Sequence, residues 1–310
     1  MCGDELKIWG ITMKNIVIKF IGLSLIISIA ACDQVELPWD KSATHKLTDE
    51  QIRTRITLQQ EMADLQEQLK RVQPIIDQSK ERLSDIRLEY SDKFISETIQ
   101  VGENPPLGLE QAPIAMVEFT DYQCPNCARH VAEVIPLLKR YYIDTGKLKY
   151  FTRDFPLAIH SQAKYAAVVA LCAGKQGRYW QMYDLLFKNQ KRLNPRLYLG
   201  LSHDLGLDPQ MMSDCLINND SVKKVDAETF YGQSIGVSST PKFFVGLYDA
   251  GEINNVIMIK GAMPYAHFSE ILDLLIDLDV VKKDMKSAHL EKVAIKREIM
   301  RLEGELSAFR

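Results

Sequence analysis

Two cysteines separated by two residues are the feature of this sequence with the clearest chemistry. Cys124 and Cys127 enclose Pro125 and Asn126 in the segment CPNC. Such a pair serves either as half of a zinc site or as a redox dithiol. Zinc would need two more ligands at suitable spacing, and the remaining cysteines and the histidines offer no such pair. The pattern therefore favours thiol–disulfide chemistry without a metal.

The position of the pair supports the same chemistry. Residues 114–120 form a short apolar run typical of a buried strand, and helical spacing of apolar residues follows Cys127. Cys124 is then expected at a helix N-terminus, where unpaired N–H groups and the helix dipole stabilise a thiolate. A lowered pKa makes a thiol the attacking group in disulfide exchange. Pro125 and Asn126 would tune the reduction potential of the pair and so the direction of electron flow. A change of ~1.4 kcal/mol in the stability of the thiolate shifts the potential of this two-electron couple by about 30 mV.

The elements that must position the pair follow from the rest of the middle segment. Residues 148–152 are predicted as a second strand, a helical stretch covers about 161–232, and 242–245 with 256–259 form a hairpin. A final helix is predicted at about 265–278. This order is typical of an α/β thioredoxin fold over residues 97–280 with a helical insertion at about 156–235.

Three segments in this region resemble the DsbA-like family of the thioredoxin superfamily. They are VEFTDYQCPNC at 117–127, the helical stretch at 155–187 and GVSSTPKFFVG at 236–246. The resemblance implies a thiol:disulfide oxidoreductase of the periplasm that needs no cofactor. It also implies two kinds of partner: cysteine-containing exported proteins as substrates, and a membrane redox protein that recycles the dithiol.

The resemblance assigns roles to individual residues. Cys124 would be the exposed nucleophile and Cys127 the buried resolving thiol, joined in a redox disulfide in the oxidised form. Thr240 would precede a cis-proline, Pro241, whose backbone presents polar groups to a substrate strand. Glu118 would be a buried acid that handles the proton of Cys127, with a pKa raised by burial. The alternative for Glu118 is an exposed strand carboxylate.

The direction of the reaction stays open at this point. Asn126 stands where the best-known oxidases of the family have histidine, which favours a milder oxidant, and Thr240 also resembles the corresponding residue of disulfide isomerases. Formation and isomerisation of disulfides are both expected. The alternative is a periplasmic or surface chaperone that uses the cis-proline groove with little redox turnover. The intact dithiol argues against a purely structural protein.

The N-terminal region resembles a bacterial lipoprotein signal. A basic start at 13–19 precedes an apolar run at 20–31, and Ile-Ala-Ala-Cys at 29–32 resembles a lipobox. We expect residues 1–31 to be a signal peptide, Cys32 to be lipidated and 32–46 to be a tether, with Met13 as an alternative start to Met1. Asp33 implies retention at the inner membrane. The alternatives are a cleaved signal without lipid or an uncleaved anchor.

Two amphipathic helices are predicted on either side of the middle segment, at 47–96 and 281–310. The first opens with a capping box of Thr48 and Gln51, and Pro74 is predicted to kink or divide it. Apolar residues recur at alternating spacings of four and three, which predicts coiled-coil helices. We expect them to form an oligomerising stalk, with each other or with copies from other chains; the alternative is that each covers its own globular domain.

The composition limits the remaining possibilities. The chain has 310 residues, 46% of them hydrophobic, which is enough for a sizeable core. A net charge of −3 without a dominant basic stretch does not favour nucleic-acid binding. Cys172 and Cys215 fall in the predicted insertion. They are expected either to form a structural disulfide or to be two buried thiols.

Overall fold

The computed structural model describes residues 7–8, 11–12, 47–89 and 94–309. The chain divides into two units, residues 1–54 and 55–310. In the first unit, strand β1 (Lys7–Ile8) pairs antiparallel with β2 (Ile11–Thr12). Cys32 and the predicted tether at 32–46 lie outside the described residues.

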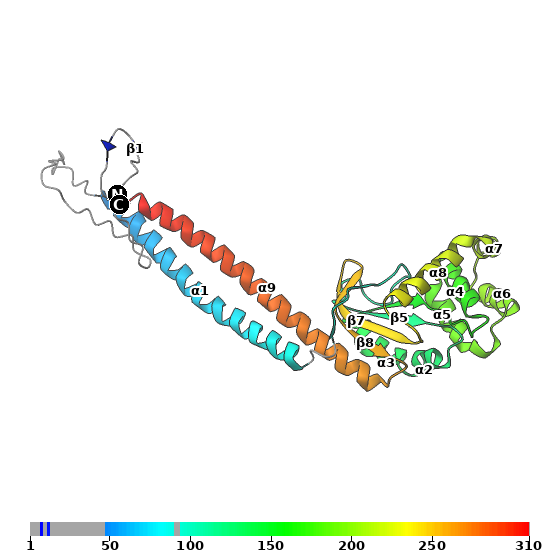
Figure 1. The fold of residues 1–310 in the computed structure, drawn as a ribbon. Helices are drawn as coiled ribbons and strands as arrows, with labels where there is room; N and C mark the ends of the chain where they lie inside the picture. The colour runs from blue at the N-terminus through cyan, green and yellow to red at the C-terminus, as the bar shows by residue number, and fades with distance from the viewer. Residues whose placement is uncertain (1–6, 9–10, 13–46, 90–93, 310) are drawn as a thin grey trace. The chain divides into compact units, whose positions relative to one another are not determined.

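A six-stranded mixed sheet runs through the globular part of the second unit (Figure 1). Its strands are β3 (Phe94–Ile95), β4 (Ile99–Gln100), β5 (Ile114–Thr120), β6 (Leu148–Asp154), β7 (Lys242–Asp249) and β8 (Glu252–Lys260). The central strand β5 runs parallel to β6 and antiparallel to β7, and β7 forms an antiparallel hairpin with β8. Every residue of β5 is buried, which fits its largely apolar sequence.

The helices that accompany this sheet fall into two groups, those before the insertion and those within it. Those before the insertion are α2 (Pro125–Glu133), α3 (Ile135–Leu138) and the π-helical turn η1 (Lys139–Ile143). The insertion contains α4 (Ala163–Gly174), α5 (Tyr179–Lys188), the 3-10 turn η2 (Gln190–Arg192), α6 (Pro195–Asp204), α7 (Pro209–Ile217) and α8 (Asn219–Ser234). The predicted thioredoxin fold with a helical insertion is confirmed.

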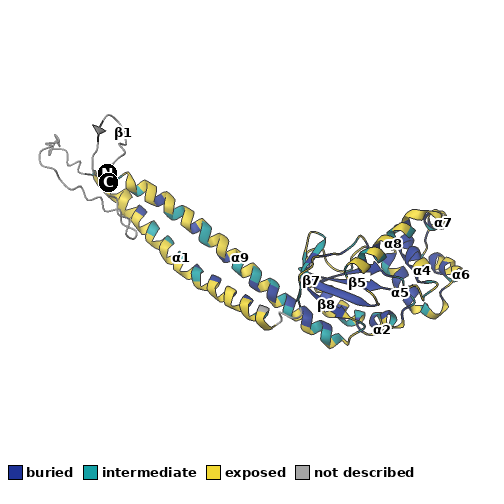
Figure 2. Ribbon diagram, in the orientation of Figure 1, coloured by how far each residue is buried: buried dark blue, intermediate teal, exposed yellow. Residues whose placement is uncertain are grey.

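Side chains of alternate strand residues enter two different hydrophobic clusters. Met116 and Phe243 pack in a cluster that contains residues of α3 and α9, whereas Val117 and Phe244 pack on the opposite face with Val237. Figure 2 shows the central strands of this sheet as mostly buried. Successive side chains of a strand point to opposite faces of the sheet. Each face of β5 therefore contributes to its own hydrophobic cluster.

The structure differs from the sequence-based expectation in several places. The short strands β3 and β4 were not predicted, and β3 occupies residues that the first terminal helix was expected to include. The helix after the dithiol stops at Glu133 and restarts at Ile135, because Pro136 has no N–H to donate to the preceding turn. The last helix, α9 (Tyr265–Ser307), is continuous through the segments predicted as two helices.

The two long helices pack on each other within the chain. Helix α1 (Asp49–Glu89) continues through Pro74 and is not divided there. Val72 and Ile76 of α1 cluster with Ala288 and Ile295 of α9, and the Lys292 ammonium of α9 donates to the Gln73 side chain. The predicted apolar face of α1 is therefore covered by α9 over this stretch. Of the arrangements expected from the sequence, this is the one in which the two helices pair with each other.

Cys172 of α4 and Cys215 of α7 form a disulfide. This is the first of the two alternatives expected for these cysteines.

Across the described part of the chain, none of the helices combines the length and the apolar character that crossing a bilayer requires.

Removing this disulfide should destabilise the protein without unfolding its sheet. The bond joins residues 43 positions apart, and closing a loop of that length stabilises a fold by about 4 kcal/mol in the chain-entropy model. We expect the double variant Cys172→Ala/Cys215→Ala to lose 2–4 kcal/mol, roughly, of unfolding free energy in urea. A loss below about 0.5 kcal/mol would show that the bond carries no stability.

Candidate active site

Cys124 occupies the N-cap position of α2. Its backbone is extended, with φ −72° and ψ 120°, and its N–H donates to the carbonyl of Asp121 at 3.0 Å. Pro125 follows at the first helical position, where its missing N–H costs nothing and its fixed φ suits the helix. No side chain caps this helix. The free N–H groups of the first turn are therefore available to the Cys124 sulfur.

The loop before β7 faces this sulfur. The Thr240–Pro241 peptide bond is cis, as the resemblance implied, and the Thr240 carbonyl lies 3.3 Å from Cys124 Sγ, where it accepts a hydrogen bond from the protonated thiol but not from the thiolate. The pKa of Cys124 is lowered from 9.0 to about 5, chiefly by a hydrogen bond from the Cys127 thiol, although burial opposes the shift. The N–H groups of Cys127 and Asn126 lower it further. At neutral pH, Cys124 is a thiolate.

Cys127 has the opposite properties. Its side chain is completely buried, and both thiols are free. Cys124 is also buried, with 5% exposure, so the expectation of an exposed Cys124 is wrong: the cis-proline loop covers most of the sulfur. Burial is the largest cause that raises the pKa of Cys127 well above its usual value, and the neighbouring Cys124 and Glu118 raise it further. The site thus holds one thiol whose lowered pKa favours the thiolate and one enclosed thiol whose raised pKa favours the protonated form.

Glu118 lies beneath the pair on β5 and is fully buried, so the alternative of an exposed carboxylate is wrong. Its Oε2 accepts hydrogen bonds from the hydroxyls of Tyr150 at 2.7 Å and Tyr183 at 3.0 Å. Burial raises its pKa from 4.5 to about 7, and the tyrosine hydrogen bonds partly offset this. Its Oε1 has no partner among the described residues. A carboxyl with these properties can accept or donate a proton near neutral pH.

The sequence did not identify the groups that hold Glu118. Tyr150 stands on β6 beside Met116 of β5 in parallel register, so its side chain shares a face with Glu118. His130 of α2 is buried and places Nε2 3.2 Å from the Tyr150 hydroxyl. Burial lowers the pKa of His130 to about 3, so that it is neutral. Alternation along β6 could have indicated Tyr150, whereas Tyr183 comes from the insertion and had no such signal.

Residues of the insertion hold the segment that enters α2. The Asp121 carboxylate accepts from the N–H of Gln123 at 2.7 Å and from the N–H of Leu157 at 2.8 Å, and it lies 2.8 Å from Nδ1 of His160. Asp121 itself is buried. The turn before Cys124 is therefore fixed by groups distant in the sequence.

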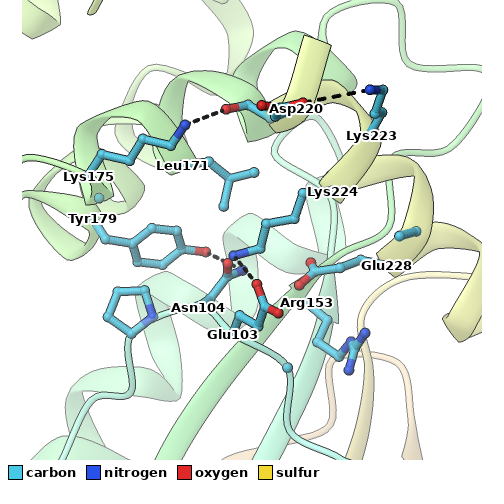
Figure 3. A pocket seen from close by; sticks show the side chains of 15 residues that line it. Glu103, Asn104, Arg153, Leu171, Lys175, Tyr179, Asp220, Lys223, Lys224 and Glu228 are labelled. Carbon is cyan, nitrogen blue, oxygen red and sulfur yellow. Dashed lines mark hydrogen bonds and ion pairs between the residues drawn. The ribbon is translucent and has the colours of Figure 1, made fainter. Parts of the chain in front are cut away.

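A second polar feature is a cavity of about 830 Å³ bordered by the loop before β5, the end of β6, and helices α4, α5 and α8 (Figure 3). Lys224 pairs with Glu103 at 3.6 Å across it, and the buried carboxylate of Glu228 accepts from the N–H of Asp154 at 2.6 Å. Neither cysteine of the dithiol lines this cavity.

Among the described residues, no group of three or more histidine, cysteine or acidic side chains is placed to hold a metal ion.

A mixed sheet with a dithiol at a helix N-terminus and a cis-proline opposite defines a protein of the thioredoxin class. A family model described as thioredoxin matches residues 100–273, more than half of the chain, and the chain therefore belongs to this family. The match includes the dithiol, Glu118 and Pro241.

Named relatives cover the same region. The chain is 30% identical over 160 residues to a putative protein-disulfide oxidoreductase of Rickettsia bellii, covering 49% of this chain and 61% of that one. It is 34% identical over 139 residues to the Na(+)/H(+) antiporter NhaA 1 of Salinispora arenicola, covering 44% of this chain and 21% of the antiporter. The chain thus spans about a fifth to three fifths of these relatives.

Solved structures agree with the predicted subgroup. The crystal structure of alpha-DsbA1 from Wolbachia pipientis is 26% identical, with a TM-score of 0.51 over 57% of this chain and 92% of that chain. The resemblance to DsbA-like proteins expected from the sequence is confirmed.

The pKa of Glu118 predicts a specific pH dependence of stability. Between pH 4.5 and about 7 the folded state keeps this proton and the unfolded state releases it, so the unfolding free energy falls as pH rises through this window. The full fall is about 3 kcal/mol. We expect Glu118→Gln to remove it when the oxidised protein is unfolded in urea at several pH values.

The matched control is Glu133→Gln, which changes an exposed acid on α2. It is expected to keep the wild-type profile. A Glu118→Gln profile parallel to that of the wild type would contradict the assignment.

Proposed function

We propose that this protein is a thiol:disulfide oxidoreductase that forms or isomerises disulfide bonds in exported proteins. The observation that carries the proposal is the unequal dithiol: Cys124 is an ionised thiol at the start of α2, and Cys127 is an enclosed one. Relatives named as protein-disulfide oxidoreductases support the same activity.

The geometry supports the following exchange. A substrate thiolate attacks Cys124 Sγ in the oxidised protein, and the bond to Cys127 breaks with Cys127 leaving as a thiolate. Glu118 is the buried acid whose charge acts on Cys127, and it supplies the proton that Cys127 takes up. A second substrate thiolate then attacks the substrate sulfur of the mixed disulfide. The substrate disulfide forms, and Cys124 leaves as a stabilised thiolate, which its low pKa favours.

The cis-proline loop is proposed to hold the substrate. Thr240 and Pro241 are buried beside Cys124, and backbone groups there can pair with an extended substrate segment. Isomerisation uses the same groups, starting from the reduced protein and a wrongly paired substrate. A chaperone with little turnover is not favoured, because binding alone does not require a thiolate beside a buried proton acceptor.

The cellular setting is proposed from the N-terminal sequence. The lipobox-like segment ending at Cys32 supports a lipoprotein of the cell envelope, with Asp33 favouring the periplasmic face of the inner membrane. A membrane redox protein would then reoxidise the dithiol. The apolar face of α1 packs on α9, so a coiled-coil pairing within the chain is proposed first. Homo-oligomerisation through these helices stays a prediction that sedimentation at increasing protein concentration would test.

Two single substitutions test the exchange. Cys124→Ser should abolish both insulin reduction and refolding of scrambled ribonuclease, because no nucleophile remains. Cys127→Ser should still let the Cys124 thiolate attack a substrate disulfide, but it should accumulate a mixed disulfide visible by mass spectrometry, because no resolving thiol remains. Cys172→Ala/Cys215→Ala should stay active as a control. Wild-type rates in Cys124→Ser would refute the proposal.

The lipid anchor has its own test. In cells that express the full chain, Cys32→Ser should prevent incorporation of labelled fatty acid and release the protein from the membrane fraction. The variant should retain thiol–disulfide exchange, since the thioredoxin domain is unchanged. Equal labelling of the wild type and Cys32→Ser would contradict lipidation at this residue.

A further inference from the structure

We propose that Gln190 is a positioning residue for the dithiol: its side-chain amide fixes the backbone where α2 begins, so that Cys124 Sγ faces the free N–H groups of the helix. The inference rests on the proposed function, because it gives Gln190 a part in the chemistry of that same pair. No feature of the sequence indicated this residue.

The contacts of Gln190 are specific. Its Nε2 donates to the Cys124 carbonyl at 2.8 Å and to the Tyr122 carbonyl at 3.1 Å. Gln190 opens the 3-10 turn η2 directly after α5, so the helical insertion delivers it. The side chain is half-buried, which limits competition from water for both bonds.

These bonds differ from the other contacts that the insertion makes with this segment. The N–H groups of Leu157 and Gln162 bond to the side chains of Asp121 and Gln123, whereas Gln190 bonds to the main chain of the nucleophile itself. The Cys124 carbonyl also accepts the first helical bond, from Ala128 at 3.1 Å. Two donors from different elements therefore fix the direction of this one carbonyl.

The direction of that carbonyl matters for the sulfur. It is set by the ψ angle of Cys124, which is 120°, and the same torsion sets where the N–H groups of Asn126 and Cys127 lie relative to Sγ. Hydrogen bonds weaken steeply when their angle departs from linearity, and those to a charged acceptor are the stronger ones. A freer ψ would therefore weaken the contacts that stabilise the thiolate.

The test is the acidity of Cys124 in two variants of the full chain. Gln190→Met keeps the length of the side chain without a donor, and Gln190→Glu keeps its shape but turns acceptor oxygens toward the two carbonyls. We expect Gln190→Met to raise the pKa of Cys124 by about half a unit to one unit, roughly a three- to tenfold loss of thiolate stability. Gln190→Glu should raise it further. Ultraviolet thiolate absorbance of the reduced protein gives the value.

Gln176→Met is the matched control. Gln176 is also half-buried and also bonds to main chain, accepting from the N–H of Asp208 at 2.8 Å, but it does not contact the dithiol segment. It should leave the pKa of Cys124 unchanged even if the unfolding temperature falls. The proposal is wrong if Gln190→Met leaves the pKa of Cys124 unchanged, whether or not the unfolding temperature falls. It is also wrong if Gln176→Met shifts the pKa of Cys124 by the same amount.

The pKa of Cys124 can be measured whether or not the protein exchanges disulfides. A wild-type protein that exchanges no disulfides would end the functional proposal, whereas the effect of Gln190 is measured on the thiol itself and needs no turnover.

Discussion

The contact between the Cys124 sulfur and the first turn of α2 is the interaction on which the rest of the site depends. Strand β5 ends four residues before the cysteine, and Asp121 turns the chain into the helix. The cis-proline loop lies on the other side of the sulfur, with the Thr240 carbonyl 3.3 Å from it. These elements are parts of the thioredoxin fold, and together they fix the position of Cys124.

Magnitudes indicate which effect stabilises the thiolate. The pKa of Cys124 falls from 9.0 to about 5. After half of this is discounted for solvent screening, about 2–3 kcal/mol remains. The largest cause of the fall is the hydrogen bond from the Cys127 thiol, and the N–H groups of Cys127 and Asn126 add to it. A helix dipole contributes up to about 2 kcal/mol in partly buried geometries, and its positive end lies on those same N–H groups, so the geometry at Cys124 controls both effects.

Much of this arrangement could be predicted from the sequence. The dithiol, strand β5, the hairpin and the insertion follow from local patterns, and the resemblance to DsbA-like proteins placed Glu118 and Pro241. The supporting groups could not be found this way: Tyr183 and Gln190 meet the site only because the insertion folds back on it. Strands β3 and β4 have two residues each, too few to show a periodicity. Pro74 does not divide α1, which is one helix from Asp49 to Glu89.

The reduction potential of the Cys124–Cys127 pair tests the central claim most directly. If the fold stabilises the reduced form through the Cys124 thiolate, the pair must be more oxidising than thioredoxin. Equilibration with glutathione should give a value between about −120 and about −200 mV. A value at or below about −270 mV, that of thioredoxin, would show that the thiolate is not stabilised as described and would contradict the account.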